Sequence, residues 1–194
     1  MSIKIFVPID STALSLGANE VAAAISKEAQ ARKLDFQIIR NSSRGLFWLE
    51  TLVEVETPQG RIGFGPVNPS DVKSLFEADF INGGKHPLAL GLVAEIDWLK
   101  KQERLTFARM GITEPTNIDQ YMAHDGFQGL KNALNLKSEA IVETVTASGL
   151  RGRGGAAFPT GIKWKTVLDT KATQKYIVCN ADEGDSGTYS DRMI

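Results

Sequence analysis

Cysteine and histidine are almost absent from this 194-residue chain, which has one cysteine and two histidines. The single thiol, Cys179, can form no disulfide within the chain and cannot hold an iron–sulfur cluster by itself. His86 and His124 have no metal ligand or nucleophile near them in sequence, so we assign both a structural role. We therefore predict no metal site in this chain. A lone thiol also fits a reducing, cytoplasmic compartment.

The chain lacks an excess of either charge and lacks long apolar runs. Its 22 Lys and Arg residues nearly balance 23 Asp and Glu residues, so it has no basic field of the kind that binds nucleic acid or anionic membranes. No stretch reaches the roughly eighteen apolar residues of a membrane span. Pro8 and Asp10 interrupt the amino-terminal apolar stretch, which a signal peptide would need intact. We predict a globular protein with neither nucleic acid nor membrane as a partner.

The first half of the chain has the pattern of a small α/β domain. Short apolar runs alternate with amphipathic helical patterns in the order β-α-β, then β-β-α. That order predicts a thioredoxin-like domain over residues 1–94. Its expected strands are 3–7, 36–40, 49–57 and 61–65, and its expected helices are 18–34 and 68–80.

The second half is predicted to begin with a connector, residues 95–116, that is helical over 95–108. A helical lead-in then starts at Asn117, and residues 117–194 form the first, incomplete part of an α/β domain. A helix over 138–148 is expected to end at Gly149, the usual C-terminal glycine. Residues 176–179, YIVC, are predicted to be a short buried strand, with Cys179 as a small buried side chain.

The segment GLRGRGGAAFPTGIK, residues 149–163, concentrates glycine and positive charge. It fails the dinucleotide fingerprint because a helix precedes it and, given Pro159 and Gly161, no helix is expected to open on it. The Walker spacing fails as well. Successive glycine N–H groups can nevertheless bind a phosphate, with Arg153 adding a guanidinium. A glycine-rich hairpin with surface arginines is the alternative.

A second polar loop follows the predicted strand 176–179. Its acids and amide, Asn180, Asp182, Glu183 and Asp185, stand where ligand-facing loops occur in α/β proteins. One loop offers cationic donors, and the other offers acceptors and amide groups. Together they suit a ligand with a phosphate at one end and a polar heterocycle at the other, and flavin mononucleotide has that shape.

Both loops resemble a known family. The stretches SGLRGRGGAAFPTGIKW (148–164) and YIVCNADEGDSGT (176–188) are similar to the signature of the 51 kDa-type flavoprotein subunit of NADH dehydrogenases, a module shared with NAD-reducing hydrogenases and formate dehydrogenases. Residues 40–50 resemble the cluster loop of a thioredoxin-like ferredoxin domain, but Ser43 and Phe47 stand where two cysteines are expected. A cluster-free domain of this kind most resembles the β (diaphorase) subunit of soluble NAD-dependent molybdenum formate dehydrogenase, with the diaphorase subunit of an NAD-reducing hydrogenase or of a respiratory complex as the alternative.

The resemblance implies roles for individual residues, none of them catalytic, because the cofactors carry the hydride. Instead of contacting a cofactor, Lys163 and the acidic loop could be ordinary solvent-exposed loop residues. Likewise, Phe158 could be an ordinary core side chain. Thr166 and Asp185 depart from the residues usual in respiratory proteins. Implied FMN contacts are Gly152, Arg153, Gly154, Gly155, Lys163, Asn180, Asp182 and Glu183, and implied NAD contacts are Phe158 and Asp185.

The implied function is hydride transfer between NAD(H) and FMN, followed by electron transfer to iron–sulfur clusters. Because the family's cysteine cluster comes later, we expect this chain to be the N-terminal part of a longer subunit, with a 4Fe-4S cluster in the missing part. Implied partners are a thioredoxin-like 2Fe-2S subunit of γ type and a molybdenum-containing catalytic subunit. A non-catalytic docking fragment with an incomplete flavin site is the alternative.

Overall fold

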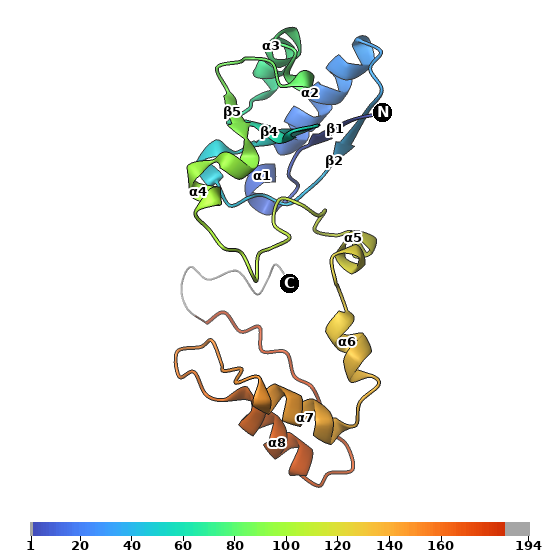
Figure 1. Cartoon of the computed structure of the whole chain (residues 1–194), viewed down its shortest axis with the longest axis vertical. Helices are drawn as coiled ribbons and strands as arrows, with labels where there is room; N and C mark the ends of the chain where they lie inside the picture. Colours follow the sequence, from blue (N-terminus) through green and yellow to red (C-terminus); the bar gives the residue numbers. More distant parts are fainter. Residues whose placement is uncertain (1, 185–194) are drawn as a thin grey trace. The chain divides into compact units, whose positions relative to one another are not determined.

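The computed structural model describes residues 2–184. The chain forms two compact units, Met1–Gln128 and Gly129–Ile194. Figure 1 shows the sheet in the first unit and the paired helices α7 and α8 in the second. The domain limits 1–94, 95–116 and 117–194 stay a prediction.

Unit 1 is built on a five-stranded mixed sheet with the order β2-β1-β3-β4-β5. β1 pairs with β2 in parallel, and the other neighbours are antiparallel. The predicted sequence of elements, β-α-β and then β-β-α, is therefore confirmed, and a fifth strand extends the sheet. The strands are β1 (Ile3–Phe6), β2 (Phe36–Ile39), β3 (Val53–Thr57), β4 (Gly60–Phe64) and β5 (Ala89–Leu92).

Helices cover this sheet and bury its apolar residues. Val21 and Ile25 on α2 are fully buried, as are Ile5 on β1 and Val55 on β3. Burial of these aliphatic side chains supplies the main driving force for the fold of unit 1. The helices of unit 1 are α1 (Ser11–Ser15), α2 (Ala18–Ala31), α3 (Val72–Glu77), α4 (Asp97–Lys100) and α5 (Ile118–Ala123), and the 3₁₀ helices are η1 (Phe47–Leu49), η2 (Pro69–Asp71), η3 (Phe80–Asn82) and η4 (Val93–Glu95).

The predicted helix over 95–108 is wrong beyond its first turn. Only α4 forms, and Leu105 and Phe107 are 90% and 62% exposed, so an extended helix would have had no surface on which to bury an apolar face. The segment after α4 instead packs against the rest of unit 1 through polar contacts. The Asn41 side chain donates to the Gly111 carbonyl at 2.9 Å, and the Ser42 amide donates to the Thr113 carbonyl at 3.1 Å.

The regular secondary structure in the described part of unit 2 is helical. The predicted helix 138–148 is confirmed as α7 (Ser138–Ala147), and Gly149 follows it with a φ of +68°. The other helices are α6 (Gln128–Ala133), which straddles the boundary of the two units, and α8 (Thr160–Asp169). No helix among residues 2–184 is long and apolar enough to cross a membrane.

The predicted buried strand 176–179 is wrong. Tyr176, Ile177 and Val178 are 77%, 101% and 84% exposed, and Cys179 is an exposed free thiol. A strand forms only where a neighbouring strand accepts its hydrogen bonds, and the described residues of unit 2 contain no strand. High β-propensity alone was not sufficient for residues 176–179 to form a strand.

Candidate functional site

The glycine-rich segment forms a closed loop between α7 and α8. The Gly152 amide donates to the Phe158 carbonyl and the Thr160 amide to the Leu150 carbonyl, each at 2.9 Å. The Arg151 Nε atom donates to the Ala157 carbonyl at 2.7 Å and ties the two arms together. Residues 153–156 are thus left as an exposed tip at the end of a short hairpin-like stem.

A helix does open on this loop, contrary to the prediction. α8 begins at Thr160, directly after Pro159. Gly161 lies in the first turn of α8. Any larger residue would be too close to α7, because a Cβ at this position would stand 2.7 Å from the Cα of Thr146, closer than real Cβ contacts allow. The glycine therefore permits close packing of two helices. The loop consequently precedes the N-terminus of α8, whose first N–H groups have no partner within the helix.

Packing against other residues between 2 and 184 does not explain the glycines at the tip. A Cβ on Gly154 or Gly155 would meet no atom within 4 Å, and on Gly152 it would make ordinary contact with the Phe158 backbone at 3.7 Å. Gly155 has a φ of +85°, which favours glycine over other residues. The space beside Gly154 and Gly155 is open to a ligand, so the tip fits a phosphate that approaches the backbone closely.

The cationic residues of the loop differ in their surroundings. Arg153 is exposed at the tip. The Lys163 ammonium lies 5.7 Å from the centroid of the Phe158 ring, so the structure brings these two predicted site residues together as a cation–π pair. Phe158 is 46% exposed, which argues against core packing for this side chain within the described part of unit 2.

The acidic loop forms a local turn. The Asn180 side-chain oxygen accepts a hydrogen bond from the Asp182 amide at 3.2 Å, and Asp182 is exposed. Glu183 is partly buried and has a φ of +49°. Asp185, the predicted NAD contact, lies outside the described residues. The carboxylates and the amide group therefore occur on one turn, as the sequence indicated.

Arg151 is the residue of the loop that the sequence analysis overlooked. It lies two residues before Arg153, yet it bonds to the Ala157 carbonyl and shapes the tip. Both residues are arginines that precede a glycine, and this shared feature does not indicate which of them bonds within the loop.

The two positions expected to hold cluster cysteines are occupied differently. Ser43 is buried, and its hydroxyl donates to Glu50 at 2.6 Å and accepts from the Gly45 amide at 3.0 Å. Phe47 is 57% exposed. Burial raises the pKa of the Glu50 carboxyl above its usual value, opposed by the bonds from Ser43 and the Leu52 amide. Among the described residues, no group of three or more potential metal ligands occurs.

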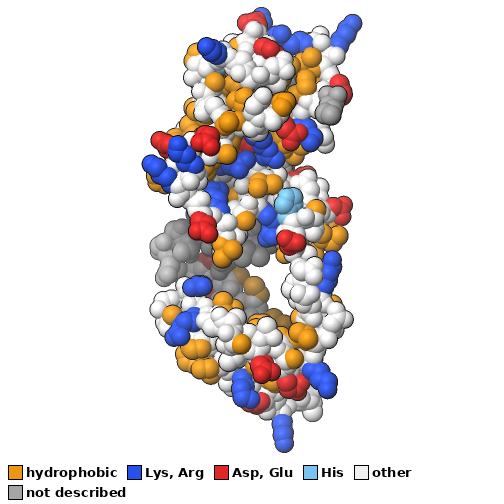
Figure 2. Space-filling model, in the orientation of Figure 1, with side chains coloured by type: hydrophobic (Ala, Val, Ile, Leu, Met, Phe, Trp, Pro, Cys, Tyr) orange, Lys and Arg blue, Asp and Glu red, His pale blue; other side chains and the backbone are white. Residues whose placement is uncertain are grey.

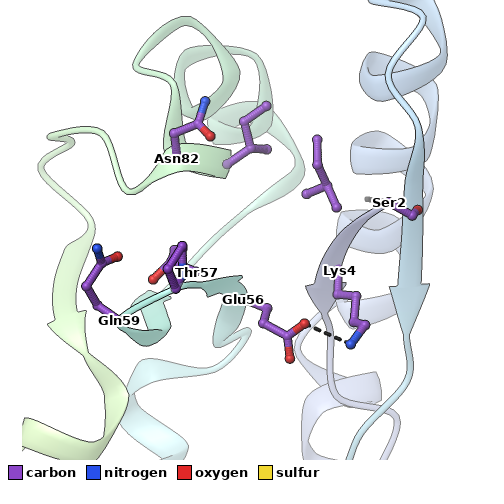
Figure 3. Close-up of a pocket in the computed structure, with 9 residues that line it drawn as sticks. Ser2, Lys4, Glu56, Thr57, Gln59 and Asn82 are labelled. Atoms are coloured by element: carbon purple, nitrogen blue, oxygen red, sulfur yellow. Dashed lines mark ion pairs between the residues drawn. The ribbon is translucent and has the colours of Figure 1, made fainter.

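Two cavities show what else the units offer to a small ligand. A cavity of about 620 Å³ in unit 1, at the start of β1 and the end of β3, contains the Lys4–Glu56 ion pair, 2.8 Å long, which joins these two strands (Figure 3). No residue of the two predicted loops lines it. In unit 2, a groove of about 450 Å³ between α7 and α8 is lined by apolar side chains such as Trp164 and Val167, and by the exposed segment 175–177. Neither cavity contains the glycine tip.

Comparison with protein families gives the class of this site. Residues 145–194 match the model described as the Nuo51 FMN-binding domain, and this match contains both loops. For the part of the chain that it covers, the finding supports the 51 kDa flavoprotein family.

Several curated proteins are similar to part of this chain. NADP-reducing hydrogenase subunit HndC of Solidesulfovibrio fructosivorans is 50% identical over 49% of this chain and 19% of its own length. NAD-reducing hydrogenase HoxS subunit alpha of Cupriavidus necator is 52% identical over 34% of this chain and 11% of its own length. An NADH-quinone oxidoreductase subunit of Aquifex aeolicus is 49% identical over 40% of this chain and 18% of its own length. The chain thus matches less than a fifth of the length of each of these relatives.

Among solved structures, the thioredoxin-like [2Fe-2S] ferredoxin of Aquifex aeolicus is similar over 46% of this chain and 97% of its own, with 20% identity and a TM-score of 0.40. The topology of unit 1 rests instead on its own strand order and pairing.

Proposed function

We propose that this chain is the N-terminal part of a diaphorase subunit that binds FMN and NAD(H) and passes electrons from one to the other. The observation that carries the proposal is the glycine tip. Gly154 and Gly155 leave open space beside the backbone, and Arg153 forms no ion pair with any residue from 2 to 184. Backbone N–H groups and an available guanidinium together suit a phosphate monoester.

Each predicted residue then has a task at the cofactor. The amides of Gly154 and Gly155 and the Arg153 guanidinium would hold the phosphate, and Gly152, whose own amide bonds the Phe158 carbonyl, would line the site with its backbone. Lys163 would place a cation at the polar edge of the ring, while the acidic turn of Asn180, Asp182 and Glu183 would accept from its N–H and hydroxyl groups. Bound FMN supplies the chemistry that exchanges a two-electron hydride for single electrons.

The nucleotide contacts belong to the proposal as well. The exposed face of Phe158 would stack on the adenine of NAD(H). The Lys163 ammonium, 5.7 Å from the centroid of the Phe158 ring, would stand beside this stack as a fixed cation. Asp185 would contact the nicotinamide half. These side chains bind and orient the nucleotide.

The complex that we propose is of the NAD-dependent formate dehydrogenase type, in a reducing cytoplasmic compartment. Its partners would be a thioredoxin-like 2Fe-2S subunit of γ type and a molybdenum-containing catalytic subunit, with a 4Fe-4S cluster in the remainder of the diaphorase subunit. A specific observation favours the alternative, the diaphorase subunit of an NAD(P)-reducing hydrogenase, because two of the similar proteins carry that name. Purification of the native complex, with metal analysis for molybdenum and assays of NAD(P)⁺ reduction by formate and by hydrogen, distinguishes the two.

The phosphate role is tested by titrating the chain with FMN and with riboflavin, which lacks the phosphate, and following flavin fluorescence. We expect Arg153→Ala to weaken FMN binding by about 10- to 100-fold, the value of a charged hydrogen bond, and to leave riboflavin binding unchanged. Lys165→Ala is the matched control, because it removes a cation that already pairs with Asp169 on α8. Equal losses for both flavins would contradict the phosphate assignment.

The same titration decides whether the chain is only a docking fragment. If wild-type chain bound neither flavin while an extended chain bound FMN, the alternative of an incomplete, non-catalytic fragment would describe these 194 residues.

A further inference from the structure

Large apolar side chains are exposed together on one face of unit 1. Trp48 and Trp98 are each 59% exposed and contact each other edge to face, with ring centroids 5.7 Å apart. Phe47 adjoins Trp48 on η1 and is also exposed, as are Leu105 and Phe107 after α4. We call these five residues the aromatic face. Figure 2 shows hydrophobic and charged side chains together on the surface around α4.

A cavity of about 590 Å³ links part of the aromatic face to two arginines. Trp98, Leu105 and Phe107 line it together with Arg44 and Arg104. A neighbouring cavity of about 490 Å³ shares these two arginines and Met110, adds Arg61, and has apolar walls such as Leu99 and Ile112. The apolar surface and the guanidinium groups therefore belong to one continuous region.

The arginines outnumber the carboxylates that could neutralise them. Glu54 is 1% exposed and is shared by two guanidinium groups, with bonds of 2.7 and 2.9 Å from Arg44 and 3.2 Å from Arg61. One carboxylate thus balances two cations. Glu103 also lines the larger cavity, but it is exposed and forms no ion pair with Arg104 in the described part of the chain.

Arg104 is held in place without being neutralised. Its Nε atom donates to the Gln102 side chain at 3.0 Å, and its Nη2 atom donates to the Arg44 carbonyl at 2.9 Å. Neutral acceptors on both sides fix the plane of the guanidinium and leave its charge available. A group fixed in this way loses little conformational entropy when it binds a carboxylate.

We propose that this region is a docking surface for an acidic segment of another protein chain. An Asp or Glu side chain of that segment binds Arg104, and apolar side chains beside it pack on Trp98, Leu105 and Phe107. Exposed tryptophan next to arginine is the composition of interface centres. A protein fits better than a small organic anion, because Phe47 and Trp48 extend the apolar surface beyond the residues that line the cavity.

This surface is independent of the proposed flavin site, since all its residues lie in unit 1. Loss of flavin binding and loss of docking are therefore separate results in separate measurements.

The test is site-specific photo-crosslinking in cells of the source organism that express the full chain. A benzophenone amino acid replaces Trp48, at the edge of the aromatic face, and crosslinked peptides are identified by mass spectrometry. We expect one partner protein, crosslinked within a few residues of an Asp or Glu. Crosslinks to unit 2 of the same chain, to a second copy, or only to membrane lipid or basic peptides would overturn the proposal, as would no crosslink at all.

Charge reversal tests the role of Arg104. Arg104→Glu should lower the crosslink yield at least about tenfold, and the opposite exchange at the mapped partner carboxylate should restore it. Lys27→Glu on α2 is the matched control, because it makes the same charge change at an exposed site that lines neither cavity. Phe107→Ala, which removes an exposed ring and leaves the charges intact, should also lower the yield. Yields unchanged in both variants would overturn the proposal.

Discussion

At the scale of single residues, the fold changes the titration of Glu50. This residue is 7% exposed, and burial raises the pKa of its carboxyl in the folded state. From the ordinary carboxyl pKa of about 4.3 upward, the folded state therefore binds more protons than the unfolded state. The free energy of unfolding must fall as the pH rises through the window between the ordinary and the raised pKa.

Glu50→Gln removes this titration. Relative to wild type, the variant should gain stability as the pH rises through that window, and the difference should level off above it. Urea unfolding at several pH values between 4 and 8 measures the difference. Ser43→Ala is the directional control: it removes a hydrogen bond that lowers the Glu50 pKa, so the window should widen. A difference between Glu50→Gln and wild type that does not vary with pH would show that the folded carboxyl titrates normally.

At the scale of elements, the contact between α7 and α8 depends on one glycine. Gly161→Ala should destabilise this helix pair by about 1–3 kcal/mol, the range for overpacking, because the added methyl group would overlap with Thr146. Far-UV circular dichroism during urea unfolding of the full chain measures the loss. Gly154→Ala is the matched control, since a Cβ there meets nothing within 4 Å, and it should leave the stability unchanged. Equal stability of the two variants would mean that the helices can separate without cost.

The same elements show how far the sequence predicts this structure. The strands β1 to β4 and the helices α2 and α3 of unit 1 were predictable because their apolar residues repeat with the period of the element and face one core. The start of α8 was not, since Pro159 and Gly161 suggest a break until the packing against Thr146 is known. The segment 176–179 has the composition of a buried strand, but its state depends on a partner strand, which local composition does not encode.

In the candidate site, too, local features could be predicted from the sequence and tertiary contacts could not. The glycine tip and the acidic turn could be predicted because backbone freedom and charge are local properties of the sequence. The tie between Arg151 and Ala157 and the pairing of Lys163 with Phe158 depend on how the arms of the loop are aligned. That register is fixed by hydrogen bonds between backbone atoms, which no side-chain pattern in residues 149–163 reveals.

At the scale of the whole molecule, the two units differ in how much apolar surface they bury. Among residues 2–184, every buried hydrophobic residue of the core lies between Ile5 and Val93, in unit 1. In the described part of unit 2, no large apolar side chain is fully buried, and Trp164 on α8 is 47% exposed. Local opening costs little where few apolar contacts break. Unit 2 should therefore open far more readily than unit 1.

Amide hydrogen exchange followed by mass spectrometry measures this difference on the intact chain. We expect amides of α2 and β3 to exchange at least about a hundredfold more slowly than those of α7 and α8, after correction for the rates of the urea-unfolded chain. Added FMN should slow exchange in residues 149–170 and leave α2 and β3 unchanged, because a ligand that binds only the folded site opposes its opening. Exchange in α7 and α8 as slow as in α2 without FMN would contradict the expectation and show that unit 2 is stable by itself.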